Sequence, residues 1–130
     1  MSKIICTDKA PRAIGPYSQA VCTGNLVFTS GQIAINPRSG NVEGESIEAQ
    51  TEQVCKNIKE LLSASGSSME KVIKTTCFLR NMEDFAAFNG VYEKYFVSKP
   101  ARSCVAVREL PKNVLVEIDT IAEVKVDECK

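Results

Sequence analysis

Apolar residues in the first half of the chain are spaced as in a β-hairpin followed by a helix. Segments 19–23 and 26–30 are short apolar strands joined by Gly24-Asn25, a pair that suits a tight hairpin turn. From residue 46 to residue 65, apolar side chains recur at helical spacing, and Gly66 is a natural helix end. The apolar helical positions are Ile47, Val54, Ile58, Leu61 and Leu62.

The second half of the chain predicts a strand, a second helix and two further strands. Residues 71–79 are rich in Val, Ile, Thr and Phe, which favour strands. Asn81 is a suitable cap for a helix over residues 82–96, whose aromatic side chains recur every three or four residues and are expected in the core. Segments 103–108 and 114–126 are the last predicted strands, and the pattern leaves open whether they pair with each other. The aromatic residues of the helix are Phe85, Phe88, Tyr92, Tyr95 and Phe96.

These elements predict an α+β fold in which two helices cover one face of a mixed sheet of five or six strands. The chain has no internal repeat, low-complexity run or linker, so residues 1–130 are expected to form a single domain. Along the last strand Val116 and Ile118 lie on one side and Ile121 on the other. Some apolar residues should therefore face away from the helices, and such a face needs a partner subunit.

Composition narrows the classes of partner. Hydrophobic residues make up 44% of the 130, enough for a core, and the 16 basic residues balance the 16 acidic ones. This neutrality argues against nucleic acid or a membrane surface as partner, since both need a basic face. No apolar run approaches the length of a membrane span, and the start lacks the features of an export signal. We therefore expect a cytoplasmic protein, with a mitochondrial one as the alternative.

The cysteines and the missing histidines limit the chemistry. Six cysteines are spread along the chain without a Cys-x-x-Cys pair, so we expect six reduced thiols and no metal site. The absence of histidine removes Ser-His-Asp and Cys-His catalysis. Acid–base chemistry at neutral pH then falls to carboxylate, tyrosine, lysine, cysteine or bound water.

An arginine and a glutamate stand out in apolar surroundings near the C-terminal end. Arg102 begins the apolar segment that follows Pro100, and Glu117 lies inside the next apolar strand. A guanidinium binds a carboxylate through two parallel hydrogen bonds, and a buried glutamate costs free energy unless it is paired. Two interpretations remain open: a site that holds a small carboxylate beside an acid or base, or a surface arginine with an edge-strand glutamate.

A series of short sequence blocks runs along nearly the whole chain. The blocks are Ala13-Ile14-Gly15-Pro16-Tyr17-Ser18-Gln19, Thr29-Ser30-Gly31-Gln32-Ile33, Val72-Ile73-Lys74-Thr75-Thr76, Phe88-Asn89-x-x-Tyr92, Pro100-Ala101-Arg102-Ser103-Cys104-Val105 and Val116-Glu117-Ile118. Each block alone is a weak signal, but their order and separations together are highly specific. Together they resemble the reactive intermediate deaminase A (RidA, YjgF-type) family, and no position that matters departs from its pattern.

The resemblance implies a homotrimer of chorismate-mutase-like α+β subunits with three clefts between neighbours. It also implies hydrolysis of 2-imino acids, such as 2-iminobutanoate and 2-iminopropanoate, to 2-oxo acids and ammonia, without a cofactor or metal. By position, Arg102 would grip the substrate carboxylate, the Cys104 backbone would contact the imine nitrogen or the water, and Glu117 would orient or deprotonate that water. The cleft would be lined by Tyr17, Ser30, Gly31 and Asn89.

Other functions compete with imine hydrolysis. A nucleophilic Cys104 is disfavoured, because a catalytic thiolate needs a basic partner and the near cation, Arg102, is assigned to substrate. A ribonuclease or translation inhibitor would need a basic groove and metal-binding carboxylates or histidines, which the neutral, histidine-free sequence does not favour. A small-carboxylate-binding or chaperone-like module is compatible with the sequence, although Arg102 together with Glu117 favours catalysis.

Overall fold

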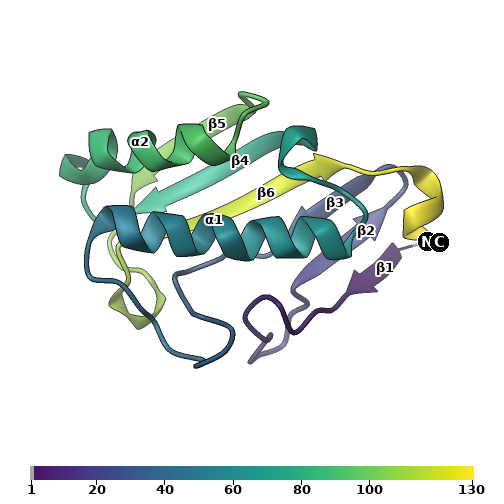
Figure 1. Ribbon diagram of the computed structural model, residues 1–130, viewed down its shortest axis with the longest axis horizontal. Helices are drawn as coiled ribbons and strands as arrows, with labels where there is room; N and C mark the ends of the chain where they lie inside the picture. Colours follow the sequence, from purple (N-terminus) through teal and green to yellow (C-terminus); the bar gives the residue numbers. More distant parts are fainter. Residues whose placement is uncertain (1) are drawn as a thin grey trace.

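One mixed sheet with two α-helices makes up the computed structural model, which describes residues 2–130 (Figure 1). The strands are β1 (Ser2–Ile5), β2 (Ala20–Thr23), β3 (Leu26–Thr29), β4 (Val72–Leu79), β5 (Ala101–Ala106) and β6 (Val116–Glu123), and the helices are α1 (Ile47–Ala64) and α2 (Phe85–Tyr95). The sheet order is β1-β2-β3-β6-β4-β5. This confirms the predicted α+β fold with a mixed sheet.

The last strand in sequence, β6, occupies the centre of the sheet. It pairs antiparallel with β3 on one side and with β4 on the other. β5 runs parallel to β4, and a parallel pair needs a long crossover, which α2 provides. The two C-terminal strands therefore do not form a hairpin, because β4 lies between them. The predicted hairpin of β2 and β3 is confirmed, and Gly24 adopts the left-handed conformation at its turn, with φ +58°.

Helix α1 follows the predicted amphipathic pattern. The Ser46 hydroxyl caps its start by accepting a hydrogen bond from the backbone N–H of Ala49 at 3.0 Å. All five apolar positions predicted for its inner face are buried. The helix ends at Ser65 and Gly66, and Gly66 has φ +79°.

Helix α2 begins later than the sequence predicts. Residues Met82–Asp84 form a separate 3₁₀ turn, and Asn81 makes no side-chain capping hydrogen bond. The prediction that Asn81 caps this helix is therefore wrong. The core role of the aromatic residues is confirmed for Phe88, Tyr92 and Phe96, which are buried.

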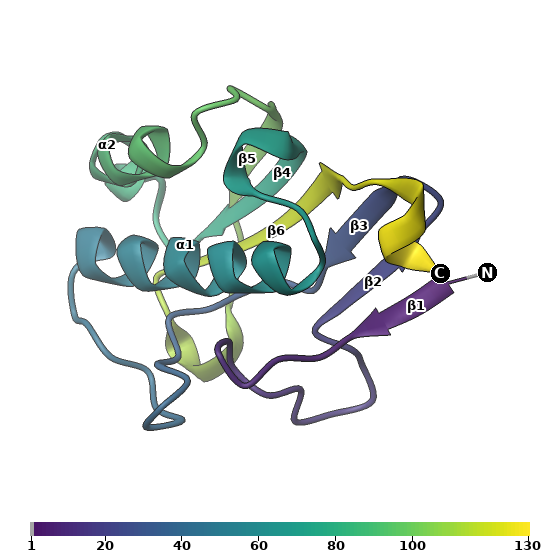
Figure 2. The ribbon, with the colours of Figure 1, turned by 45° about the vertical axis from the view of Figure 1, so that its right-hand side comes forward.

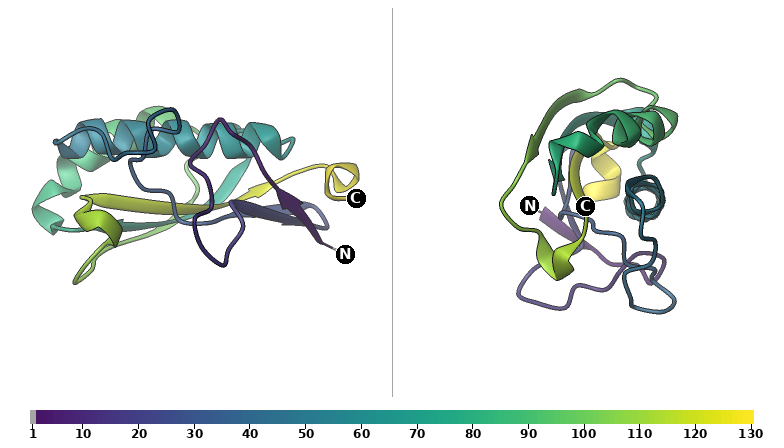
Figure 3. Two further views of the ribbon diagram at one scale, coloured as in Figure 1. Left: turned by 90° about the horizontal axis from the view of Figure 1, so that it is seen from below. Right: turned by 90° about the vertical axis from the view of Figure 1, so that its left-hand side faces the viewer.

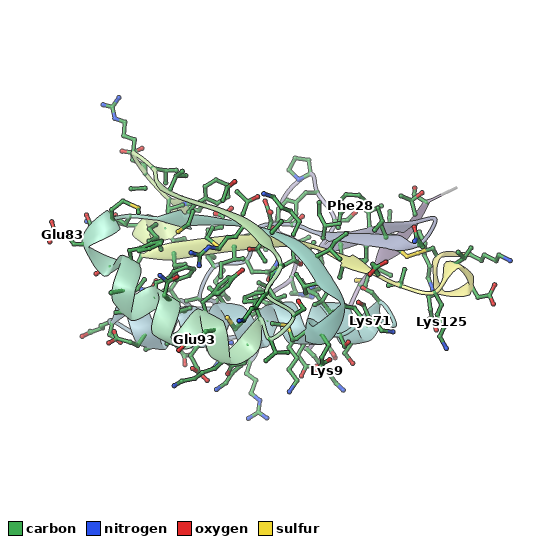
Figure 4. All side chains as sticks on the ribbon, turned by 90° about the horizontal axis from the view of Figure 1, so that it is seen from above. Lys9, Phe28, Lys71, Glu83, Glu93 and Lys125 are labelled. Atoms are coloured by element: carbon green, nitrogen blue, oxygen red, sulfur yellow. A yellow bond between two sulfur atoms is a disulfide. The ribbon has the colours of Figure 1, made fainter. Side chains whose placement is uncertain are left out.

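Both helices lie on the same side of the sheet, as the left view of Figure 3 shows. The opposite face carries Phe28 and its register partner Ile121, and Phe28 is 39% exposed. Figure 4 shows Phe28 on the opposite side of the sheet from Glu93 of α2. Val105 of β5 is 48% exposed, and by register it shares this outer face with Phe78 and Glu117. The expectation of apolar residues on the uncovered face is confirmed.

The two ends of the described chain lie close together (Figure 2). The sequence pattern did not predict β1, which pairs with β2. A 3₁₀ turn at Val126–Cys129 packs beside β2. A disulfide joins Cys22 of β2 to Cys129, with Cα atoms 5.3 Å apart. The expectation of six reduced thiols is therefore wrong for this pair, because folding brings together residues 107 positions apart. Cys6, Cys55, Cys77 and Cys104 are free.

Candidate functional site

Arg102 lies on the helix-covered side of the sheet. Its register partner on β4 is Thr75, which is fully buried. The guanidinium donates a hydrogen bond from Nη1 to Asn89 Oδ1 at 2.7 Å. Its Cζ lies 5.4 Å from the ring centroid of Phe85 and 4.9 Å from that of Tyr92, within cation–π range. Phe85, Asn89 and Tyr92 follow one another at helical spacing on α2, so one stripe of that helix holds the guanidinium.

No carboxylate of residues 2–130 forms an ion pair with Arg102. Within residues 2–130, the one ion pair closer than 4 Å joins Lys130 and Asp127 at the surface. The guanidinium is held by an amide and two rings, which leave its charge intact. Arg102 borders a cavity of about 450 Å³, whose other lining residues are Tyr92, Glu93, Phe96, Val97, Lys99 and Pro100. Its free donors suit a carboxylate or another small anion.

Glu117 lies on the opposite face of the sheet. Its neighbours Val116 and Ile118 point into the core, and period-two alternation turns Glu117 outward. It lines a cavity of about 430 Å³ together with Tyr17, Ser30 and Gly31. The remaining lining residues are Pro11, Arg12, Ile14, Gln19, Gln32, Ile33, Ile35, Pro111 and Lys112.

Gly31 is a glycine because the Glu117 carboxyl lies against its backbone. A Cβ built on Gly31 would clash with Glu117 Oε2 and would stand 2.8 Å from Cδ, closer than real Cβ contacts allow, and a tight 3.1 Å from Cγ. Ser30 is fixed beside it, since its hydroxyl donates to the Ser18 carbonyl at 2.6 Å and its N–H to Gln19 O at 2.9 Å. Tyr17 completes the group with a ring that is half exposed.

The environment of Glu117 makes its carboxylate a stronger base than usual. Burial, followed by the negative charge of Asp119, raises the pKa of Glu117. Among the described residues no hydrogen-bond donor lies on this carboxylate, so its lone pairs are free to accept a proton from a ligand or water.

Cys104 offers its backbone rather than its thiol. Burial raises the pKa of the Cys104 thiol, opposed by the charge of Arg102, so the thiol is protonated at neutral pH. The N–H of Val107 donates to Leu79 O of β4, and strand alternation then turns the N–H and C=O of Cys104 away from β4. Because β5 is the last strand of the sheet, these groups lie on its free edge.

The predicted site residues thus fall into two groups within one chain. Arg102 and Asn89 are in contact on the helix side, whereas Tyr17, Ser30, Gly31 and Glu117 gather on the other face. The cavities beside Arg102 and Glu117 share no lining residue. Sequence reasoning missed Phe85 and Tyr92 as contacts of Arg102, having placed them in the core. Their spacing on either side of Asn89 was the available signal.

Two further observations concern the described part of the chain. No three His, Cys, Asp or Glu side chains among residues 2–130 are grouped so that they could hold a metal ion. Neither helix in this part has the length and apolar character that crossing a membrane requires.

Fold and site together define an α+β domain with a free arginine at one sheet edge and a glutamate that lines a cavity on the uncovered face. A family model described as Endoribonuclease L-PSP matches residues 7–124, nearly the whole chain. The chain therefore belongs to this family, which is also known as RidA/YjgF. The predicted resemblance is confirmed.

Relatives of this chain carry several functional names. AldR of Lactococcus lactis, named as a candidate regulator, is 56% identical over 124 residues, which cover 95% of this chain and 98% of AldR. The 2-iminobutanoate/2-iminopropanoate deaminase of Escherichia coli is 46% identical, with 94% of this chain and 98% of the relative covered. The crystal structure of E. coli TdcF with bound serine superposes with a TM-score of 0.88 at 43% identity, covering 93% of this chain and 98% of TdcF.

Proposed function

We propose that this protein hydrolyses 2-imino acids, among them 2-iminobutanoate and 2-iminopropanoate, to 2-oxo acids and ammonia. The 46% identical E. coli relative carries the name of this activity. A 2-imino acid matches the two halves of the site. Its carboxylate binds the unpaired guanidinium of Arg102, and its electrophilic C2 is attacked by a water that Glu117 activates. A water held beside an imine gains most of its rate from orientation, which can contribute several kcal/mol.

The working site is proposed to lie between subunits of a homotrimer. Arg102 and Glu117 face opposite sides of one sheet, so one chain cannot bring them to the same small molecule. Phe28, Ile121 and Val105 give the uncovered face an apolar surface that a neighbour would bury. In each cleft, Arg102 and the free edge of β5 would come from one subunit, and Glu117 with Tyr17, Ser30 and Gly31 from the next. Closed symmetry repeats this contact three times.

The proposed reaction needs only water as co-reactant. Arg102 binds the substrate carboxylate, and Glu117 takes a proton from water as the oxygen bonds to C2 and the C=N electron pair moves to nitrogen. Glu117 then returns its proton to the nitrogen. The proton of the new hydroxyl then passes through Glu117 to the amine nitrogen, the C2–N bond breaks, and ammonia leaves as the C2–O bond becomes the carbonyl of the 2-oxo acid. The balance is R–C(=NH)–COO⁻ + H₂O → R–CO–COO⁻ + NH₃.

The environment of the Glu117 carboxylate is the observation that best supports hydrolysis. It is half-buried, has a raised pKa and lies over Gly31 in a cavity with Tyr17 and Ser30. The test is ammonia release from 2-iminobutanoate generated in the cuvette by a threonine dehydratase or an amino-acid oxidase. Faster release with the wild-type protein than with Glu117→Gln supports the proposal. Release at the uncatalysed rate contradicts it.

A second candidate is a module that binds small amino or oxo acids without turnover. The bound serine in the TdcF crystal structure favours it, since TdcF is 43% identical to this chain. Both functions need Arg102, but only hydrolysis needs Glu117 to accept a proton. Calorimetry with 2-oxobutanoate alongside the ammonia assay separates them: a pure binder gives heat of binding and no turnover. The ribonuclease activity in the family description gains no support from the balanced charge and absent histidines.

A further inference from the structure

The Arg102 guanidinium belongs to a set of contacts that runs through the Tyr92 ring to the buried Thr75. Thr75 on β4 is the register partner of Arg102 and is fully buried. Its hydroxyl shares a hydrogen bond of 2.7 Å with the hydroxyl of Tyr92 on α2. The ring of Tyr92 in turn lies 4.9 Å from the Arg102 Cζ. Thr75, Tyr92 and Arg102 are thereby linked to one another, because the β4–β5 pairing joins Thr75 and Arg102.

The Tyr92 ring has little freedom to move. It stacks on Phe96 at a centroid distance of 4.4 Å and contacts Phe88 at 5.4 Å. Burial raises the pKa of Tyr92 to about 12, so its hydroxyl keeps its proton and the bond to Thr75 at working pH. The ring face presented to Arg102 is therefore fixed by two aromatic neighbours and one buried hydrogen bond.

We infer that Tyr92, anchored by Thr75, is a positioning residue that holds the Arg102 guanidinium in the orientation that binds the substrate carboxylate. The inference rests on the proposed function for what Arg102 binds. A free arginine side chain loses rotamer freedom when it grips a ligand, and a guanidinium already held in place has less to lose. A ring face adds cation–π attraction without the neutralising charge of a carboxylate. Asn89 sets the hydrogen-bonded side of the guanidinium, while Tyr92 sets its plane.

Four variants test the inference, each with a defined loss. Tyr92→Phe keeps the ring but removes the hydroxyl, Thr75→Val removes the other hydroxyl, and Tyr92→Leu removes the ring. Tyr95→Phe is the matched control. It also removes a tyrosine hydroxyl from α2, but that hydroxyl donates to Glu52 and does not contact Thr75. The measurements are KM and kcat for 2-iminobutanoate, the Kd of 2-oxobutanoate, and the ¹⁵N order parameter of the Arg102 Nε–H bond in the ligand-free trimer.

Positioning predicts effects on binding and on arginine order together. Tyr92→Leu should raise KM and Kd about 10-fold, between the factors for an exposed and a desolvated cation–π contact, because Arg102 is half-buried; it should also lower the order parameter. Tyr92→Phe should raise them about fivefold, the typical value of one buried hydrogen bond, and adding Thr75→Val should cost little more because both act through one bond. Tyr95→Phe should change neither KM nor Kd.

Two results with folded variant proteins overturn the inference alone. If folded Tyr92→Leu and Tyr92→Phe proteins keep the wild-type KM, Kd and order parameter, Tyr92 is only a core residue. If the order parameter falls but 2-oxobutanoate binds as before, the orientation that Tyr92 gives Arg102 does not contribute to binding. A wild-type protein that neither binds 2-oxobutanoate nor releases ammonia overturns the proposed function instead, and this inference with it; the wild-type assays distinguish that failure from the first two.

Discussion

Replacing Gly31 by alanine should remove activity while leaving the fold intact. The new Cβ would stand 2.8 Å from Glu117 Cδ, where ordinary contact begins at 3.4 Å, so the carboxyl must retreat by at least about 0.6 Å. A displacement approaching 1 Å at a catalytic group typically costs about 10²-fold. The obstructing atoms belong to the movable end of a side chain, and Gly31 does not adopt a positive φ. The free energy of unfolding should therefore change by less than about 1 kcal/mol.

The assay pairs ammonia release with urea unfolding of the same preparation. Gly90→Ala is the matched control: Gly90 lies within α2 with nothing inside 4 Å of an added Cβ. That change should stabilise the protein by about 0.5–1 kcal/mol and leave turnover unchanged. In a Glu117→Gln background, Gly31→Ala should cost little further activity, because both changes act on one carboxylate. Wild-type turnover by folded Gly31→Ala protein would refute the role assigned to Glu117.

Three further changes test separate parts of the account. Arg102→Lys should weaken 2-oxobutanoate binding by about 1.5–3 kcal/mol in calorimetry, because an ammonium cannot reproduce the two-pronged contact; near-normal binding would argue against it. Burial and the charge of Asp119 raise the pKa of Glu117 in the folded chain above its value in the unfolded chain. The ionised carboxylate therefore destabilises the fold at pH values above the folded-state pKa. This destabilisation is gone at pH values below the unfolded-state pKa, where the group is protonated in both states. Glu117→Gln should therefore raise the urea midpoint at neutral pH but not below about pH 4, and an equal gain at both would contradict the raised pKa. Cys129→Ser should lower the free energy of unfolding by about 3–4 kcal/mol more under oxidising conditions than with reductant, whereas Cys6→Ser, at an exposed free thiol, should be neutral in both.

The spacing of apolar residues was sufficient to predict the elements that are defined by their own local sequence. The α1 face and the β2–β3 hairpin follow directly from residue spacing and turn chemistry. β1 was missed because three of its four residues are exposed, and it forms through pairing with β2. The disulfide could not be predicted either, since nothing local brings Cys129 to Cys22.

The candidate site was predicted as a set of residues but not as an arrangement. Motif blocks identified Arg102, Glu117 and Gly31, yet strand alternation fixes faces only once the sheet order is known. That order sends Arg102 toward α2 and Glu117 to the uncovered face. The sequence pattern places Phe85 and Tyr92 in the core, because an aromatic stripe that packs on apolar neighbours and one that holds a cation have the same helical spacing.

A site that takes Arg102 from one subunit and Glu117 from its neighbour should be restored by mixing two inactive variants. Arg102→Ala and Glu117→Gln chains with different affinity tags are co-expressed, and trimers carrying both tags are purified in succession. In such a trimer one of the three clefts combines an intact Arg102 with an intact Glu117, so ammonia release should recover to about one third of the wild-type rate. Mixed trimers that stay as inactive as either parent would contradict a site shared between subunits.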